Sequence, residues 1–215
     1  MQAPLPHTIL DQTFWLSAQR AIYWDAEITL IPSDLHFGKT GHFRKAGIAV
    51  PQAVFKEDLQ RLLSLIQFFK PEQIIAVGDL FHSKANLELD LFKRWRDDFS
   101  SLTFHLVKGN HDILKGDWYE GANLTVTEGV MQVGNIYFSH EECSEVEGAF
   151  TFCGHLHPGV VFNGFGKQTL RLPCFYFSEK QCILPAFSRF TGTANVQPKK
   201  SDTLFAIAED ALIKM

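Results

Sequence analysis

Residues 51–70 place apolar side chains at the spacing of one buried helical face. The apolar positions recur at intervals of three, four and seven: Val54, Phe55, Leu59, Leu62, Leu63, Ile66 and Phe69. This periodicity predicts an amphipathic helix whose apolar stripe faces a core. Pro51 suits its first helical position, and Pro71 provides a stop.

A second helical stripe is predicted between about residues 86 and 99. Its apolar members are Leu91, Phe92, Trp95 and Phe99. The residues between them are charged, and this set is expected to form a solvated helix face: Lys93, Arg94, Arg96 and Asp97.

Short β-type runs make up most of the remaining chain. They cover residues 14–16, 21–24, 27–31, 73–77, 103–107, 135–138, 150–153, 160–162, 169–172, 175–177, 182–185 and 203–208. Helices lie between the early strands, and many hairpin-like strands come later. This mixture predicts an α/β or α+β chain in which two sheets pack together with helices outside. No repeat or long linker divides the chain, so residues 1–215 are expected to form one domain.

Composition and charge narrow the possible functions. With 46% apolar residues the chain is an ordinary globular protein. Its 20 Lys and Arg against 24 Asp and Glu give a net charge of −4, which excludes a broadly basic protein that coats nucleic acid. The N-terminus lacks a secretory pattern and no apolar stretch is long enough for a membrane span, so a cytoplasmic location without membrane contact is expected. The 4 cysteines contain no C-x-x-C pair, so a structural zinc site is not expected.

Five of the predicted strands run into residues that can bind metal. These residues are Asp34 and His36 after residues 27–31, Asp79 after 73–77, Asn110 after 103–107, His140 after 135–138, and His155 and His157 after 150–153. Each cluster alone is a weak signal, and Gly-Asp alone is a turn signal. Because ligands gather beyond the carboxyl ends of strands in open α/β sheets, the five clusters together are expected to converge.

The residue types match a pair of divalent metal ions. Carboxylate oxygens, an amide oxygen and imidazole nitrogens, without thiolate, suit Mn²⁺, Fe or Zn²⁺. Seven ligands with Asp79 shared would make two four-ligand sites that leave room for water. Two ions about 3.5–4 Å apart can bring an activated water to a phosphorus centre.

The series D-x-H, G-D, G-N-H-D, H and G-H-x-H resembles the calcineurin-like metallophosphoesterases. The resemblance implies a four-layer αββα sandwich with a dinuclear metal site. It also implies two ligand sets: Asp34, His36, Asp79 and His157 for one ion, and Asp79, Asn110, His140 and His155 for the other. His111 would then be the catalytic histidine, which stabilises the transition state or protonates the leaving oxygen, and Asp112 would orient it.

A narrower resemblance covers about residues 25–190. The run DLHFGKTGHFRKAGIAVP, with GDLFHS and GHLHPG, is similar to the bacterial ligase-associated DNA-damage-response phosphoesterases, the PdeM family. This similarity implies a Mn-dependent phosphoesterase or endonuclease with a DNA repair role. It also implies a DNA ligase, an exonuclease and a helicase as possible partners.

Basic residues follow the first metal motif directly. Lys39, His42, Arg44 and Lys45 could hold the phosphates that flank a scissile bond. The alternative is an ordinary solvated basic loop. His82, three residues after Asp79, is either a partner that supports the metal ligands or a solvated loop residue.

Three functions are compatible with this sequence. The favoured one is a phosphodiesterase that acts on DNA or RNA, and a small-molecule phosphoesterase for cyclic nucleotides, nucleotide anhydrides or phosphomonoesters is its enzymatic rival. A non-catalytic metal-binding scaffold is less favoured, because all seven ligands and His111 are present. The acidic net charge predicts weak binding of free duplex, with any nucleic-acid contact confined to a local basic loop.

Overall fold

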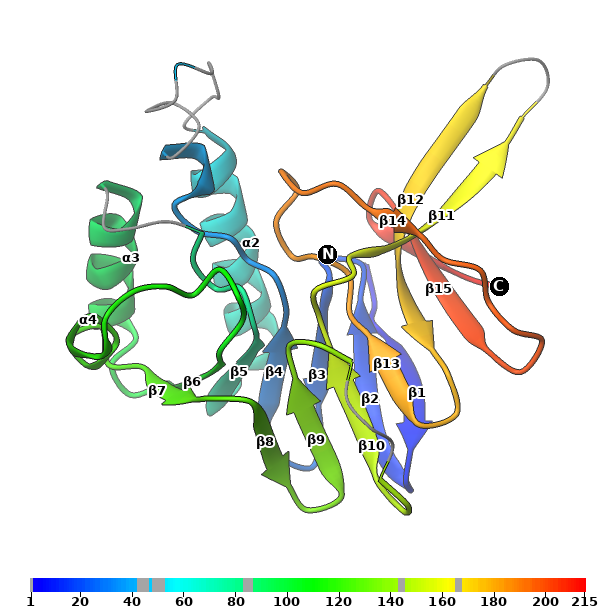
Figure 1. Cartoon of the computed structure of the whole chain (residues 1–215), viewed down its shortest axis with the longest axis horizontal. Coiled ribbons are helices and arrows are strands. Elements are labelled where there is room, and N and C mark those ends of the chain that lie inside the picture. The colour runs from blue at the N-terminus through cyan, green and yellow to red at the C-terminus, as the bar shows by residue number, and fades with distance from the viewer. Residues whose placement is uncertain (1, 42–46, 48–52, 83–86, 143–145, 165–167) are drawn as a thin grey trace.

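The computed structural model describes residues 2–41, 47, 53–82, 87–142, 146–164 and 168–215. In these ranges the chain forms two mixed β-sheets that pack together, with helices outside one of them (Figure 1). The strands of the first sheet lie in the order β1 (Leu5–Ile9), β2 (Gln12–Ser17), β3 (Ala21–Trp24), β4 (Thr29–Pro32), β5 (Gln73–Val77), β6 (Thr103–Val107) and β7 (Thr125–Thr127). Strands β1 to β4 pair antiparallel, and β4 to β7 pair parallel.

The second sheet is built from the later part of the chain. Its strands lie in the order β14 (Ala194–Asn195), β11 (Pro158–Asn163), β12 (Thr169–Phe177), β13 (Gln181–Ile183), β10 (Phe150–Cys153), β9 (Ile136–Ser139) and β8 (Val130–Val133). Strand β15 (Thr203–Ala208) pairs with β12 and with β16 (Ala211–Lys214). Strands β9 and β10 are parallel, so their carboxyl ends lie at the same edge.

The alternation of side chains along β5 explains how the two sheets meet. Ile75 and Val77 belong to the core between the sheets, whereas Ile74 and Ala76 belong to the core beneath the helices. Successive residues of a strand point to opposite faces, so a strand buried on both faces is apolar throughout. The core between the sheets is rich in phenylalanine, including Phe152.

Helices α2 (Ala53–Phe69), α3 (Leu87–Asp98) and α4 (Gly116–Glu120) adjoin the first sheet. Leu62 and Ile66 of α2 and Phe92 of α3 contact the same core as Ile74. The two helices predicted from periodicity are therefore confirmed, although residues 51, 52 and 86 of the predicted ranges lie outside the described residues. No helix in the described ranges is long and apolar enough to cross a membrane.

Arg96 corrects the predicted solvated face of α3. Its side chain is 1% exposed, and its guanidinium donates hydrogen bonds to the carbonyls of Phe99, Leu102 and Asn123. These carbonyls lie outside α3, in the segments that follow α3 and α4, and a buried carbonyl needs a hydrogen-bond partner. Arg96 thus joins the end of α3 to the loops around it.

The expected sandwich of two packed sheets with helices outside is confirmed. In the described ranges, helices lie on the first sheet alone. The outer face of the second sheet carries a small apolar cluster instead: Val160, Cys174, Val196, Leu204 and Ala206. Strands β11, β12 and β15 and the chain around Val196 supply its members. Figure 1 shows the β11–β12 hairpin on the side of the molecule away from α3.

Candidate metal centre

The predicted convergence of strand ends is observed. Strands β4, β5 and β6 are parallel and end at one edge of the first sheet. Strands β9 and β10 end beside them. This is seen from the backbone N–H of His155, which follows β10 and donates to the carboxylate of Asp34, at 3.3 and 3.2 Å from its two oxygens. The metal-binding residues from both sheets therefore meet at one place.

One group of possible ligands consists of Asp34, His36 and His157. Their ligand atoms all lie within 4.8 Å of one another. His157 Nε2 lies 3.1 Å from Asp34 Oδ1, and the rings of His36 and His157 have centroids 5.4 Å apart. Asp34 and His36 are buried, and His157 is half-buried.

A second group consists of Asp34, Asp79 and His140, again with ligand atoms within 4.8 Å of one another. Asn110 Oδ1 lies 3.0 Å from His140 Nε2, and His155 Nδ1 lies 3.1 Å from the same nitrogen. The structure thus brings all seven predicted ligands together. Asp34 belongs to both groups, a feature that the sequence did not suggest.

Asp79 belongs to the second group and also approaches the first. Its Oδ1 is 3.5 Å from His140 Nε2, and its Oδ2 is 4.0 Å from His36 Nε2. The carboxylate therefore has one oxygen toward each set of imidazoles, which is the arrangement that a bridging ligand needs.

The hydrogen bonding of the histidine ring nitrogens shows whether metal ions would fit the site. Both nitrogens of His36, Nδ1 of His140 and Nε2 of His157 are buried without a hydrogen-bond partner among the described residues. A buried polar atom without a partner is costly, and a divalent ion would accept the lone pair of one ring nitrogen of each of these imidazoles. Together with the carboxylate and amide oxygens, this donor set fits two divalent metal ions.

The electrostatics of His36 favour the form that binds metal. Burial, together with the nearby charges of Lys39 and of other histidines, lowers the pKa of His36 to about 2. The imidazole is therefore neutral at physiological pH, and a neutral imidazole is the ligand form.

Five of the possible ligands have left-handed backbone. The φ angles are 51° at Asp34, 50° at His36, 46° at Asp79, 64° at His155 and 52° at His157. This conformation is uncommon for residues other than glycine and stores about 1–3 kcal/mol at each position. Neighbouring strand ends hold it in place through backbone bonds between them, such as that from the Asp34 N–H to the Gly78 carbonyl (3.2 Å). The sequence patterns did not predict this left-handed backbone conformation.

Glycines allow the ligands to approach the backbone closely. A Cβ at Gly154 would lie 2.1 Å from Ser33 Oγ and 2.7 Å from Asp34 Oδ2. A Cβ at Gly78 would lie 1.9 Å from His140 Nδ1. The glycine of the Gly-Asp motif, a turn signal in the sequence, therefore also leaves space for a ligand.

His111 lies at the edge of the metal centre. Its ring is half-buried, with its centroid 5.7 Å from that of His36, and it belongs to neither ligand group. The His111 backbone N–H donates to Asp79 Oδ1 at 2.9 Å. The predicted catalytic histidine is therefore placed beside the ligands.

Asp112 differs from its prediction. Its buried carboxylate accepts hydrogen bonds from the backbone N–H groups of Gly109 (2.9 Å), Phe81 (2.9 Å) and Leu80 (3.4 Å). Burial raises the pKa of this carboxyl to about 7. Among the described residues it thus contacts the backbone around His111, where contact with the imidazole ring was expected. Asp112 positions the loop that follows β6 against the loop that follows β5.

His82 is brought to the site, which favours the supporting role over a solvated loop position. The His82 ring centroid lies 4.3 Å from that of His111 and 5.2 Å from that of His36.

Lys39 is half-buried at the rim of the centre. Burial lowers its pKa, and the carboxylates of Asp79 and Asp34 oppose this shift. Its Nζ donates to Thr191 Oγ1 at 3.4 Å. The other predicted substrate-binding residues, His42, Arg44 and Lys45, lie outside the described residues.

Residues 186–194, the rim segment, form a wall of the centre that sequence patterns did not predict. The N–H of Phe187 donates to the Ser33 carbonyl (2.8 Å), that of Ser188 to the Asp34 carbonyl (3.2 Å), and that of Ala194 to the His157 carbonyl (2.9 Å).

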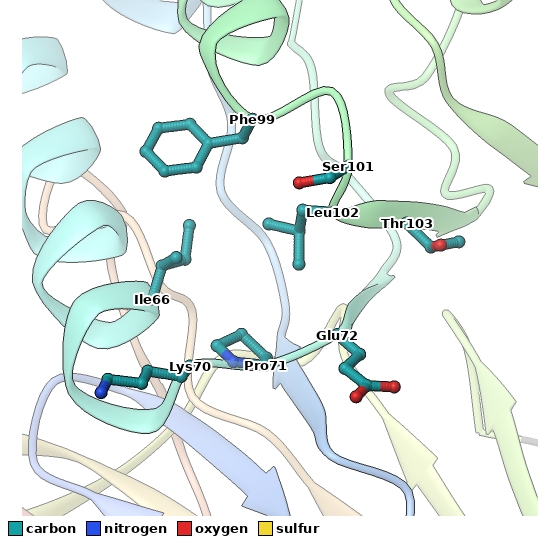
Figure 2. Close-up of a pocket in the computed structure, with 8 residues that line it drawn as sticks. All are labelled: Ile66, Lys70, Pro71, Glu72, Phe99, Ser101, Leu102 and Thr103. Atoms are coloured by element: carbon teal, nitrogen blue, oxygen red, sulfur yellow. The ribbon is translucent and has the colours of Figure 1, made fainter.

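The cavity in Figure 2 is separate from this centre. It has a volume of about 540 Å³, and Ile66, Phe99 and Leu102 line it together with Pro71. Glu72 and Thr103 also line it, and these residues lie at the amino ends of β5 and β6. The metal centre lies at the opposite, carboxyl ends of the same strands.

A family model described as calcineurin-like phosphoesterase matches residues 29–176. This range contains every one of the seven possible ligands and His111. The chain belongs to the calcineurin-like phosphoesterases. It is a metal-dependent phosphoesterase, and the buried Asp and His groups are the dinuclear metal site typical of the family.

Among solved structures, this phosphoesterase is similar to the nuclease MPE of Pseudomonas putida. The two chains are 30% identical, and the match has a TM-score of 0.84 and covers 98% of this chain and 100% of the other. A search of curated proteins gave no match.

Proposed function

We propose that this phosphoesterase hydrolyses phosphodiester bonds in nucleic acid with two Mn²⁺ ions. The observation that carries the proposal is the pair of adjoining ligand groups, with Asp34 in both and with Asp79 close to histidines of both, 4.0 Å from His36 and 3.5 Å from His140. Two ions held so close together suit displacement at one phosphorus atom. The similarity to a nuclease along the whole chain supports nucleic acid as the substrate class.

The ligand sets follow the family pattern. Asp34, His36, Asp79 and His157 would hold one ion, and Asp79, Asn110, His140 and His155 the other. When bound, the ions supply Lewis acidity at the phosphoryl oxygens and lower the pKa of water to about 7. The mixed nitrogen and oxygen donors suit Mn²⁺, with Fe and Zn²⁺ as alternatives.

The residues beside the ligands act on the substrate. The His111 imidazole, next to His36, would stabilise charge on a phosphoryl oxygen or give a ring N–H proton to the leaving oxygen. The Lys39 ammonium would contact a non-bridging phosphate oxygen. His42, Arg44 and Lys45 remain candidates for contacts with flanking phosphates, on the strength of their place in the sequence.

The cellular part of the proposal rests on resemblance. Similarity to the ligase-associated DNA-damage-response phosphoesterases supports a cytoplasmic DNA repair role. It also supports a DNA ligase, an exonuclease and a helicase as partners. The acidic net charge of −4 agrees with recruitment by partners better than with tight binding to bare duplex.

A hydrolysis panel with Mn²⁺ tests the substrate class. Its members are bis-p-nitrophenyl phosphate, p-nitrophenyl phosphate, 2′,3′-cyclic nucleotides and single-stranded DNA. We expect cleavage of the diester and of the DNA. Activity on the monoester alone would remove the nuclease proposal and leave a small-molecule phosphoesterase.

A further inference from the structure

A cleft lined by arginines lies behind the rim segment. It has a volume of about 410 Å³ and is lined by Arg20, Arg171 and Arg189, with Glu209 and Asp210 at one side. A volume of this size lies within the range of about 300–1,000 Å³ that is usual for ligand pockets.

The rim segment connects this cleft to the metal centre. On the cleft side, Arg20 Nη1 donates to the carbonyls of Ala186 (3.2 Å) and Ser188 (3.0 Å), and Arg171 Nη1 donates to the Thr193 carbonyl (3.0 Å). On the metal side, the same segment contacts Lys39, Asp34 and His157 through Thr191, Ser188 and Ala194, as described above. One short wall of backbone therefore separates the arginines from the ligands.

Positive charge exceeds negative charge in the cleft. Asp210 accepts a hydrogen bond from Gln19 Nε2 at 2.8 Å. Burial lowers the pKa of Arg20 to about 10, and the nearby charges of Arg61 and Arg189 add to this shift. Arg61 is itself paired with Asp58 at 2.7 Å. An anion in the cleft would relieve the repulsion between these guanidinium groups.

Arg189 is placed to receive such an anion. Its side chain is exposed, and its guanidinium makes no hydrogen bond or ion pair with any described residue. Arg171 is also exposed, and its position is fixed by the bond to Thr193. Two guanidinium groups at one cleft match the oxygens of a phosphate, which arginine can bind in a bidentate manner.

We propose that this cleft binds a backbone phosphate of the nucleic-acid strand whose scissile phosphate lies at the metal centre. The strand would cross the rim segment between residues 189 and 193. Leu172, Pro173 and Ile207 add an apolar wall that can contact the sugar or base next to that phosphate. The substrate class rests on the proposed function, whereas the location of the subsite rests on the cleft.

Binding without catalysis tests the cleft directly. The probe is a fluorescein-labelled single strand of about 12 nucleotides, titrated with the full chain in EDTA so that no cleavage occurs. We expect Arg171→Gln/Arg189→Gln to weaken binding about fivefold or more and to reduce the slope of log K against log salt by about 0.7 for each lost phosphate contact. Arg189→Gln alone, at an exposed position, should show part of the effect without a folding defect.

Arg94→Gln is the matched control for Arg189→Gln, because Arg94 is exposed on α3 and its substitution removes the same single charge. An equal loss of binding in this control, or no loss in the double variant, would overturn the proposal. With Mn²⁺ present, the double variant should raise the KM for the oligonucleotide relative to the KM for bis-p-nitrophenyl phosphate. If the unchanged protein binds the strand through these arginines but cleaves neither substrate, the proposed function fails and the subsite stands.

Discussion

Asp34 shows how single residues prepare the metal centre. Ser33 Oγ lies 2.6 Å from its Oδ2, and the His155 backbone N–H contacts the same carboxylate. The Asp34 backbone is tied at both its N–H and its carbonyl, to Gly78 and Ser188. Contacts of this kind fix the orientation of a ligand before an ion binds.

The first prediction at this scale concerns His111. We expect His111→Asn to lower turnover of bis-p-nitrophenyl phosphate by about 10²–10⁴-fold, the usual contribution of general acid–base catalysis. Metal content should be unchanged, since His111 belongs to neither ligand group. Steady-state kinetics and metal analysis of the same sample check both parts. Unchanged turnover would mean that His111 is not catalytic.

The second prediction concerns the close approach at Gly154. Gly154→Ala places a Cβ within 2.1 Å of Ser33 Oγ and 2.7 Å of Asp34 Oδ2, so Mn²⁺ affinity should fall about 10–100-fold, as it does when the support of a ligand is lost. Gly116→Ala is the control, because a Cβ added there meets nothing within 4 Å. Titration with Mn²⁺ measures the affinity of both variants. Equal affinities would show that a Cβ at position 154 does not disturb the metal centre.

The sequence predicted which residues would meet at one place, but it did not predict the contacts that support them. The order of the motifs pointed to the seven ligands and His111, because each follows a recognisable strand. The contacts of Asp112 with Phe81, and of Gly154 with Ser33, join residues far apart in the chain. No local pattern records such contacts, so they needed the structure.

At the scale of elements, parallel strands explain why distant motifs meet. Strands β4, β5 and β6 in one sheet, and β9 and β10 in the other, each deliver their ligands just beyond their carboxyl ends. Parallel strands of this kind are buried and apolar. The parallel pairing that brings the ligands together therefore also gives the strands the apolar runs from which the sequence predicts them.

The elements that the sequence missed are exposed. Strands β1, β7, β8, β14 and β16 carry mostly half-buried or exposed residues, so they lack the continuous apolar runs of the central strands. The sequence also predicted residues 169–172 and 175–177 as separate strands, but the structure joins them through Pro173 in β12. Strand β12 changes partners here, from β11 to β13 and β15.

A third prediction tests the buried arginine of α3. Arg96→Met would leave the carbonyls of Phe99, Leu102 and Asn123 without this donor. Each buried carbonyl without a partner costs about 1–3 kcal/mol. The free energy of unfolding should therefore fall several times more in Arg96→Met than in a variant with an exposed substitution. Urea denaturation checks this against Arg94→Met on the same helix, where a change within about 0.5 kcal/mol is expected. Equal effects would contradict the role of Arg96.

For the whole molecule, the distribution of charge limits how the proposed nucleic-acid substrate could bind. The net charge of −4 leaves little general attraction for a polyanion. Positive side chains instead gather locally, at Lys39 and at the arginine cleft on the two sides of the rim segment. This distribution suits a few phosphates near the metal centre rather than a long stretch of duplex.

The fourth prediction follows from this distribution. We expect the protein alone to bind duplex DNA weakly at about 0.15 M salt, because few phosphates can be neutralised. A gel-shift titration at that salt concentration measures it. Nanomolar binding of duplex would contradict this view of the surface.

Both sheets contribute residues to the one dinuclear metal centre. The most direct measurement is the metal content of the purified chain after loading with Mn²⁺ and removal of excess ion. We predict two ions per chain, and at most one after Asp79→Asn, because the Asp79 carboxylate has one oxygen toward His36 and the other toward His140. One ion or none in the unchanged protein, or two ions retained by Asp79→Asn, would contradict the account.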